Sequence, residues 1–269
     1  MSLTSTLCDR AADCVELFYR TPASSVAHLL PEGLELVLRG RWAFWSITVC
    51  PIEKLPPDSL PPALDVLEKP SESAVYQVAY RLLVQAMTHR ADVRRGLYLV
   101  RGDVDDGGLT MARERVSGPR REHPAEIRLA VQHGEVALDV KSHDGVSDVR
   151  ARMLMSSSRL ADGSCFPTLM DAREFLDHKP YLFTVAGNAN HRSLQIAERE
   201  PSGLSRQQAS IAVDSAAFNL FAQLEQTEVE LERATWSQSM TCRWRVSQTE
   251  KLLEQASTPS PAVALPGVA

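Results

Sequence analysis

The chain has 269 residues, of which 44% are hydrophobic, and a formal net charge of −5 at pH 7. This hydrophobic share is enough for a buried core in one large domain or two small ones. The acidic balance gives no general basic field, which excludes nucleic acid and anionic membranes as default partners.

The N-terminus lacks a basic region followed by an apolar run, and no apolar stretch of 18 residues occurs in the sequence. We therefore expect a cytoplasmic protein. The cysteines are scattered and include no Cys-x-x-Cys pair, which predicts thiols instead of a disulfide framework or a zinc site. They are Cys8, Cys14, Cys50, Cys165 and Cys242. The histidines show no metal-binding spacing, so the sequence predicts neither a metal nor a cofactor.

Strand patterns dominate the chain up to residue 200. Residues 26–36 predict a short helix, ended by Pro31 and Gly33, that leads into a strand. Six of the sixteen prolines predict a long loop over 51–70. Short helices are predicted at 109–117 and 172–176. β-Branched content or alternating apolar positions predict further strands at 42–49, 75–84, 96–101, 126–131, 135–140, 148–155, 181–186 and 193–197.

About nine strands with few helices predict a mainly β (α+β) fold, and such a string closes most naturally into an antiparallel β-barrel. From residue 205 onward, the Ala, Gln and Glu content predicts a helix over 207–224, and alternating apolar positions predict a strand over 239–246. We therefore divide the chain into a barrel domain at 1–203, a helix-plus-strand extension at 204–256 packed on the barrel, and a flexible tail at 257–269.

Four segments resemble a known family in their order and composition. Residues 29–36 read Leu-Leu-Pro-Glu-Gly-Leu-Glu-Leu and precede a Trp-containing strand and a proline-rich loop. The strand at 77–84, the stretch from 96 to 121 and a weaker match at 172–183 follow. Together they resemble the acetoacetate decarboxylase-like superfamily, and more closely its uncharacterised YqjF-like branch, a domain of unknown function. The resemblance covers residues 14–200 and implies an acetoacetate decarboxylase-like antiparallel β-barrel with a few short helices.

The segment from Arg113 to Arg121 reads Arg-Glu-Arg-Val-Ser-Gly-Pro-Arg-Arg and resembles the one that bears the Schiff-base lysine of these decarboxylases. Arg120 occupies the lysine position. An imine requires an amine that can lose its proton near pH 7, which a guanidinium with a pKa above about 12 cannot do. The family's strand glutamate is Gln77 here, and an amide cannot act as a base. The resemblance therefore implies the fold but not acetoacetate decarboxylation.

The resemblance also implies that Arg81, Arg113 and Arg120 converge near one end of the barrel cavity, and that Gln77 can hydrogen-bond a ligand there. Guanidinium forks suit a carboxylate, which predicts a small organic acid or ketone-like anion as the ligand. In the alternative interpretation, the arginines at 113–121 form a solvated helix face paired with acidic neighbours. Arg81 is the strongest candidate, because a charge inside an apolar strand pattern needs a partner.

The leading hypothesis is a small-molecule-binding barrel protein without an assigned catalytic residue. A second hypothesis is a lyase-type or other enzyme that acts on a carboxylate or enolate without an imine, through the fixed positive charges of Arg81 and Arg120. A third is a non-catalytic structural or interaction protein with a filled barrel. The sequence leaves open which of these holds, and it is compatible with a homo-oligomer.

Overall fold

The computed structural model describes residues 6–7, 14–52, 75–87, 92–105, 122–155, 160–188, 191–199, 207–220, 229–238 and 242–251. The strands are β1 (Thr6–Leu7), β2 (Cys14–Pro22), β3 (Leu34–Leu36), β4 (Trp42–Ile52), β5 (Val75–Met87), β6 (Val93–Val104), β7 (Glu122–Gln132), β8 (Glu135–Ser142), β9 (Ser147–Leu154), β10 (Tyr181–Asn188), β11 (His191–Arg199), β12 (Gln207–Leu220), β13 (Glu230–Gln238) and β14 (Cys242–Lys251). The helical elements are α1 (Ala23–Val26), the short 3₁₀ helix η1 (Ala27–Leu29) and α3 (Leu169–Asp177).

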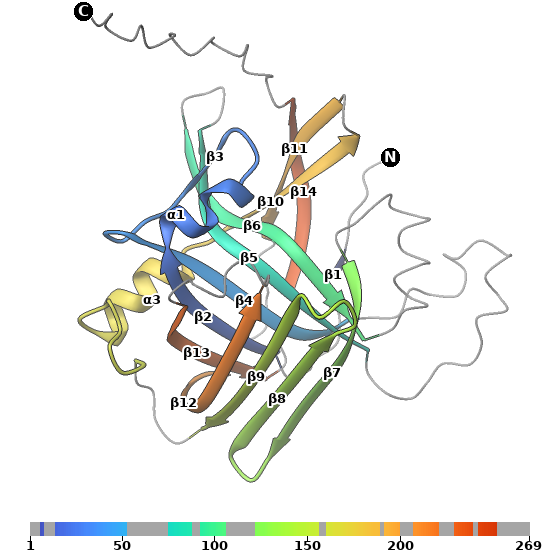
Figure 1. The fold of residues 1–269 in the computed structure, drawn as a ribbon. Helices are drawn as coiled ribbons and strands as arrows, with labels where there is room; N and C mark the ends of the chain where they lie inside the picture. The colour runs from blue at the N-terminus through green and yellow to red at the C-terminus, as the bar shows by residue number, and fades with distance from the viewer. Residues whose placement is uncertain are drawn as a thin grey trace, which may run out of the picture.

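The strands form one barrel-shaped sheet (Figure 1). Its pairings run from β6 through β7, β8, β9, β12, β13, β2 and β4 to β5, and β5 pairs with β6 again, which closes the ring. Strands β10, β11, β14 and β1 continue from β6 as a separate arm, and β3 lies beside β4 on the same edge of β5. This architecture confirms the predicted mainly β, barrel-shaped fold with short helices.

The meander of β7, β8 and β9 shows why the sequence specifies these strands. Apolar residues alternate with polar ones, so Val136, Leu138 and Val140 are buried while exposed side chains face the other way. The loop between β7 and β8 has two residues, His133 and Gly134, both with positive φ (51° and 80°). Two such residues make a type I′ turn, whose twist matches the flanking strands.

Two apolar cores lie on the two faces of the sheet. The inner core contains side chains from β2, β4, β5, β6, β7, β8, β9 and β13. Because these strands lie all round the ring and contribute to one cluster, the ring encloses this core. Trp45 and Tyr80 are among its largest members. The outer core contains Phe44, which packs against Phe166 and Phe175 where α3 covers the outside of the ring.

The helix predicted over 207–224 is wrong, because the structure forms strand β12 at 207–220. The first part of β12 pairs with β13, and its second part pairs with β9. Helix propensity is a weak preference of a fraction of a kcal/mol per residue, and pairing along both edges overrides it. Strands β2 and β13 were also absent from the sequence-based prediction.

The strand predicted over 239–246 is present as β14, which pairs with β11. Strands on both sides of residue 203 therefore belong to the same sheet, whereas the division of the chain into domains stays a prediction. The proline-rich loop after Ile52, the helix predicted at 109–117 and the tail at 257–269 lie outside the described residues.

A buried ion pair joins two neighbouring strands that are far apart in the sequence. Glu232 of β13 is completely buried and accepts a hydrogen bond from Arg20 of β2. It also accepts hydrogen bonds from the hydroxyl of Ser164 and the backbone N–H of Cys165. One carboxylate therefore fixes the β2–β13 pair to the segment that leads into α3.

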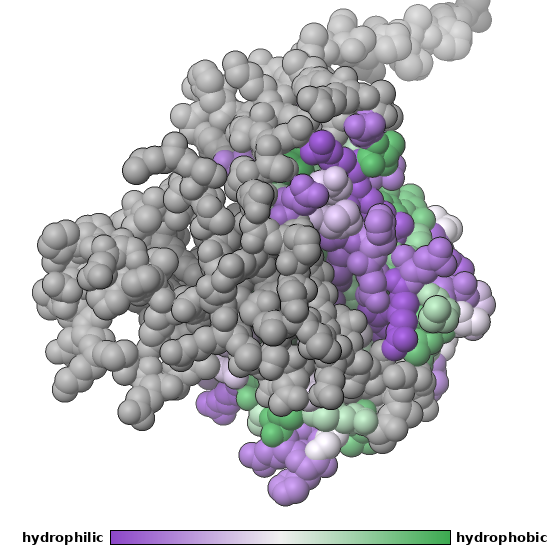
Figure 2. Space-filling view, turned by 180° about the vertical axis from the view of Figure 1, so that it is seen from behind, coloured by the Kyte–Doolittle hydropathy of each residue, from purple (hydrophilic) through white to green (hydrophobic). Residues whose placement is uncertain are grey.

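Viewed from behind, the described part of the surface is mostly hydrophilic, with hydrophobic residues scattered along it (Figure 2). The large exposed hydrophobic side chains among the described residues, Leu38, Val93, Leu154 and Met170, lie on separate segments. Across the part of the chain that the structure describes, no helix is long and apolar enough to cross a membrane.

Candidate functional site

A polar cluster lies where β6 ends, and a β-bulge directs it towards the inner core. The pairing of β5 with β6 shifts register after Tyr80, which lies opposite Arg101. The shift leaves Val100 as an extra residue in β6. Because directly opposite residues share a face of the sheet, Arg101 lies on the inner face with Tyr80, and Asp103 lies there opposite Val78.

Asp103 is the centre of this cluster and is completely buried. Its Oδ1 accepts a hydrogen bond from Nε of Arg101 at 2.7 Å, and its Oδ2 accepts one from the hydroxyl of Ser147. The hydroxyl of Tyr80 lies close enough to interact electrostatically with the same carboxyl group. Three strands of the ring, β5, β6 and β9, thus meet at one acid.

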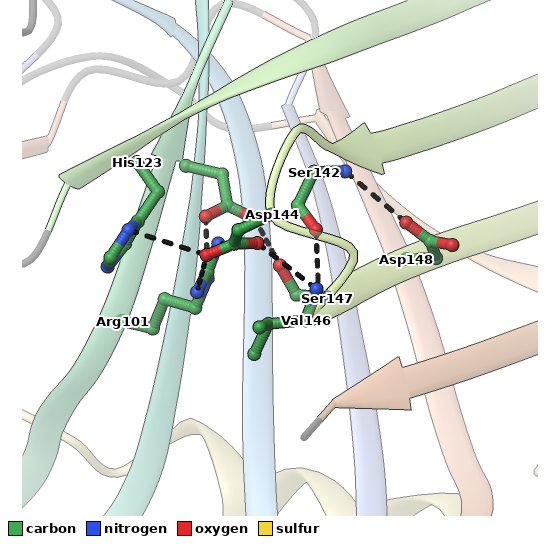
Figure 3. Close-up of polar contacts among 8 residues, drawn as sticks. Arg101, His123, Ser142, Asp144, Val146, Ser147 and Asp148 are labelled. Carbon is green, nitrogen blue, oxygen red and sulfur yellow. Dashed lines mark hydrogen bonds and ion pairs between the residues drawn. The ribbon is translucent and has the colours of Figure 1, made fainter. Parts of the chain in front are cut away.

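Arg101 extends the network towards the surface (Figure 3). Its Nη1 and Nη2 both donate to Asp144, each at 2.9 Å, in a bidentate pair. Nδ1 of His123, on β7, lies 3.5 Å from Oδ2 of Asp144. The Arg101 side chain is 5% exposed, whereas those of Asp144 and His123 are 37% and 42% exposed. The cluster therefore connects the barrel interior with solvent.

The turn between β8 and β9 is fixed by its own short polar contacts (Figure 3). The backbone N–H of Val146 donates to Oδ1 of Asp144 at 3.1 Å, and that of Ser147 donates to the hydroxyl of Ser142 at 2.9 Å. The backbone N–H of Ser142 donates to Asp148 at 3.3 Å. Asp144 and Ser147 are thus held in place for Arg101 and Asp103 before any ligand arrives.

The two carboxyl groups bound to Arg101 have opposite pKa shifts. Burial raises the pKa of Asp103, and the hydrogen bond from Ser147 and the charge of Arg101 only partly oppose it. Burial alone would raise the pKa of Asp144, but the hydrogen bonds from Arg101 together with the Val146 N–H lower it to about 2. Asp144 is therefore the permanent anion of the pair, and Asp103 takes up a proton more readily than an ordinary aspartate.

This arrangement can exchange a proton but has little net positive charge to offer. The pKa of Tyr80 is raised well above its ordinary value, first by burial and then by the charge of Asp103, so its hydroxyl stays protonated. Arg101 is engaged by two carboxylates at once. The cluster is therefore suited to acid–base chemistry at Asp103, whereas an anionic ligand needs positive charge from elsewhere.

A second polar cluster lies on the outer face of the ring. Lys179, which follows α3, donates a hydrogen bond to Glu16 of β2, and Ser46 donates to the same carboxylate oxygen at 2.6 Å. The Lys179 ammonium lies 4.2 Å from the centre of the Phe18 ring. Burial alone would raise the pKa of Glu16, but the charge and hydrogen bond of Lys179 lower it to about 2. Burial lowers the pKa of Lys179, and the charge and hydrogen bond of Glu16 only partly oppose this shift, so its ammonium loses a proton more readily than that of an ordinary lysine.

The residues predicted to bind a ligand do not belong to the Asp103 cluster. Gln77 and Arg81 are buried on β5, on the face opposite the inner core that contains their neighbours Val78 and Tyr80. Nη1 of Arg81 donates to the hydroxyl of Thr48 at 3.0 Å. Gln77 and Arg81 thus share the outer face, four residues apart. Arg113 and Arg120 lie outside the described residues, so the convergence of the three arginines stays a prediction.

The sequence-based reasoning missed Asp103 and its partners. Asp144 and Ser147 lie about 40 residues further along the chain, in a turn whose sequence shows only turn-forming residues. The only available signal was the pair Arg101 and Asp103 at the end of an apolar strand, where a charge requires a buried partner. No group of three or more His, Cys, Asp or Glu side chains that could hold a metal ion occurs within the described ranges.

Solved structures of other proteins share this architecture at low sequence identity. A structure from structural studies of acetoacetate decarboxylase aligns with a TM-score of 0.55 at 14% identity, covering 94% of this chain and 93% of the other. The enduracididine biosynthesis enzyme MppR complexed with pyruvate aligns with a TM-score of 0.53 at 13% identity, covering 91% and 89%. An acetoacetate decarboxylase-like enzyme from Sphingomonas wittichii RW1 aligns with a TM-score of 0.52 at 16% identity, covering 89% and 91%.

No protein-family model and no curated protein matches the sequence. The structural alignments extend over nearly the whole of each chain and include the residues beyond 203 that the sequence resemblance did not cover. At this level of identity they identify an architecture and leave the chemistry open. The chain therefore has the acetoacetate decarboxylase-like fold.

Proposed function

We propose that the protein is a small-molecule-binding barrel protein of the YqjF-like branch, whose ligand is a small organic acid or ketone-like anion. The observation that carries this proposal is the alignment over 91% of the chain with MppR, which was solved as a complex with pyruvate. Pyruvate is both a carboxylate and a ketone, so it defines a ligand class that can be tested directly.

Imine chemistry is not part of the proposal. Arg120 stands at the position of the Schiff-base lysine in the resembling segment, and a guanidinium cannot form an imine. Lys179 lies outside the resembling segment, on the outer face of the ring, where it donates a hydrogen bond to Glu16. Lys141, at the end of β8, is exposed to solvent. Acetoacetate decarboxylation is therefore not expected.

A second candidate function is an enzyme that moves a proton on a carboxylate or enolate without an imine, and Asp103 favours it. This buried carboxyl group on the inner face has a raised pKa and a Tyr80 hydroxyl beside it, as a general acid–base requires. Proton exchange at the carbon next to the pyruvate ketone, followed by NMR in D₂O, tests this. Asp103→Asn should abolish the exchange. Asp139→Asn, which changes a partly exposed side chain of β8, should not. Equal exchange in both variants excludes Asp103.

The ligand proposal is tested by thermal unfolding of the full chain with pyruvate, acetoacetate and a panel of small carboxylates. At about 100 times its dissociation constant, a ligand stabilises the folded state by about 2.7 kcal/mol. Arg81→Ala and Arg120→Ala should each reduce this stabilisation. Arg128→Ala is the matched control, because the Arg128 side chain is 78% exposed and pairs only loosely with Glu126, at 3.8 Å.

Two results would contradict the ligand proposal. If no acid in the panel raises the melting temperature of the wild-type protein at millimolar concentration, the ligand class is wrong. If an acid raises the melting temperatures of the wild type, both arginine variants and the control equally, the ligand class stands and the arginine pocket is wrong.

A further inference from the structure

Two cysteines lie directly opposite each other on neighbouring strands of the ring. In the β2–β4 pair, Val15 lies opposite Val49. Continued by one residue, back to Cys14 on β2 and forward to Cys50 on β4, the same register places Cys14 opposite Cys50. Directly opposite residues of antiparallel strands point to the same face, and their Cα atoms lie about 4.5–5.5 Å apart. A disulfide needs a Cα separation of about 4.4–6.8 Å, so these positions can be bridged without moving the strands.

The two side chains also contact each other as thiols. Both residues carry thiols, and the Cys14 S–H hydrogen-bonds the sulfur of Cys50. Cys14 is 4% exposed, whereas Cys50 is only partly buried. Cys50 is therefore the thiol that a small oxidant reaches first, and Cys14 is placed to react with it.

The surroundings of Cys50 favour its thiolate. Nη1 of Arg81 donates to Thr48, which lies two residues before Cys50 on the same face of β4. The hydrogen bond from Cys14 lowers the pKa of Cys50, and the positive charge of Arg81 adds to this effect, whereas burial and the negative charge of Glu16 oppose it. A partly exposed thiolate beside a guanidinium is the usual environment of a reactive cysteine.

We propose that Cys14 and Cys50 form a peroxide-sensitive dithiol site, in which oxidation links β2 to β4 through a reversible disulfide. The Cys50 thiolate attacks one oxygen of hydrogen peroxide, the O–O bond breaks, and the products are a sulfenic acid and, after protonation, water. The Cys14 sulfur then attacks the Cys50 sulfur, its proton passes to the departing hydroxyl group, and a second water leaves. Two thiols thus lose two electrons to one peroxide.

Cys165 provides an internal control for the reactivity of Cys50 towards peroxide. Cys165 is also partly buried and carries a thiol. Burial and then the negative charge of Glu232 raise its pKa to about 11. Cys165 should therefore react much more slowly with peroxide than Cys50 does.

The disulfide can be mapped in the full-length protein, because trypsin releases Cys14 in residues 11–20 and Cys50 in residues 42–54. After brief treatment with hydrogen peroxide and alkylation of the remaining thiols, we expect a cross-linked pair of these two peptides. The intact mass should fall by about 2 Da, for the two hydrogens lost, and dithiothreitol should restore it. Cys165 should be recovered alkylated.

Variants distinguish the thiol that reacts with peroxide, Cys50, from the thiol that then forms the disulfide, Cys14. In Cys14→Ser, dimedone should trap a sulfenic acid on Cys50, whereas in Cys50→Ser the remaining Cys14 should stay a thiol. Arg81→Met should slow the oxidation of Cys50 several-fold, and Arg128→Met, on the exposed face of β7, should leave the rate unchanged. The proposal is overturned if Cys165 is oxidised before Cys50, or if Cys50 becomes linked to a cysteine other than Cys14.

Discussion

Asp103 and Asp144 show how position decides the behaviour of two identical side chains. Both bind Arg101, but one is completely buried and the other lies partly in solvent. Burial therefore raises the pKa of Asp103, whereas hydrogen bonds from Arg101 and a backbone N–H lower that of Asp144. The sequence alone predicts neither shift, because both depend on contacts between β6 and a turn about 40 residues away.

For the lysine side chains we predict that none forms an imine with acetoacetate. Incubation with acetoacetate and borohydride should leave the mass of the protein unchanged, because Arg120 cannot form an imine and Lys179 lies outside the resembling segment, hydrogen-bonded to Glu16. Intact-mass spectrometry measures this. A reduced adduct that maps to Lys54, Lys69, Lys141 or Lys179 would show that imine chemistry has been moved to another position.

Glu16→Gln should destabilise the protein and change its response to acid. The folded-state pKa of Glu16, about 2, lies below its ordinary value of 4.5. Its contribution to the free energy of unfolding is therefore complete above pH 4.5 and is lost as the pH falls through 2. The shift corresponds to roughly 3 kcal/mol. Removing the anion also leaves the buried Lys179 ammonium without this partner.

Urea unfolding at pH 7 and pH 3 measures the effect. The wild type should lose more stability between these two pH values than Glu16→Gln does. Glu126→Gln is the matched control: its side chain is 59% exposed, and its stability at pH 7 should change by less than about 0.5 kcal/mol. Equal losses in the wild type and Glu16→Gln would mean that the Glu16–Lys179 pair does not set the acid response.

Among the elements, the meander of β7, β8 and β9 was predicted well because each strand carries its own alternating pattern and a two-residue turn. β12 was not, because residues such as Ala216 and Ala217 favour a helix, and only the pairing with β9 and β13 overrides this preference. β2 combines apolar residues on one face with Glu16 and Arg20 on the other, and their partners come from β13 and from the segment after α3.

Strand β6 depends on one glycine for its contact with β10. Gly96 pairs with Tyr181, and a Cβ atom added at Gly96 would collide with the Tyr181 carbonyl and the Phe183 ring. Gly96→Ala should therefore push β10 away and lower the free energy of unfolding by about 3 kcal/mol. Gly134→Ala is the control: its Cβ would meet open space, and only its positive φ costs about 1 kcal/mol.

Chemical denaturation of the two glycine variants gives the comparison. A larger loss at Gly134 than at Gly96 would mean that the β6–β10 contact is looser than this geometry requires. In that case the arm of β10, β11 and β14 would hold to the ring through its other contacts.

For the molecule as a whole, two strands after residue 203, β12 and β13, are parts of the ring. β12 and β13 stand between β9 and β2. From the sequence we predicted a strand beyond residue 203 and assigned it to an extension packed on the barrel. The resemblance ended near residue 200 and did not indicate which strands of the barrel sheet still lacked a neighbour. Fold class could thus be predicted from patterns within strands, and ring closure could not, because it depends on pairings over long separations.

Truncation after Gly203 should leave an insoluble or strongly destabilised protein. The cut removes the strands that join β9 to β2, so it exposes two strand edges and the inner core. Soluble yield and size-exclusion chromatography measure this. The control is removal of residues 257–269, which follow the last strand, β14. A Gly203 truncation that stays soluble, monomeric and as heat-stable as the full chain would show that these strands are dispensable.

The salt bridge between Arg20 and Glu232 has a consequence for synthesis on the ribosome. Its two residues are 212 positions apart, so β2 emerges from the ribosome long before β13 has been translated. Throughout that interval the edge of β2 that β13 will cover is open to pairing with other chains. Ring closure must therefore wait until β13 has been translated, and until then the open strand edge is exposed to aggregation.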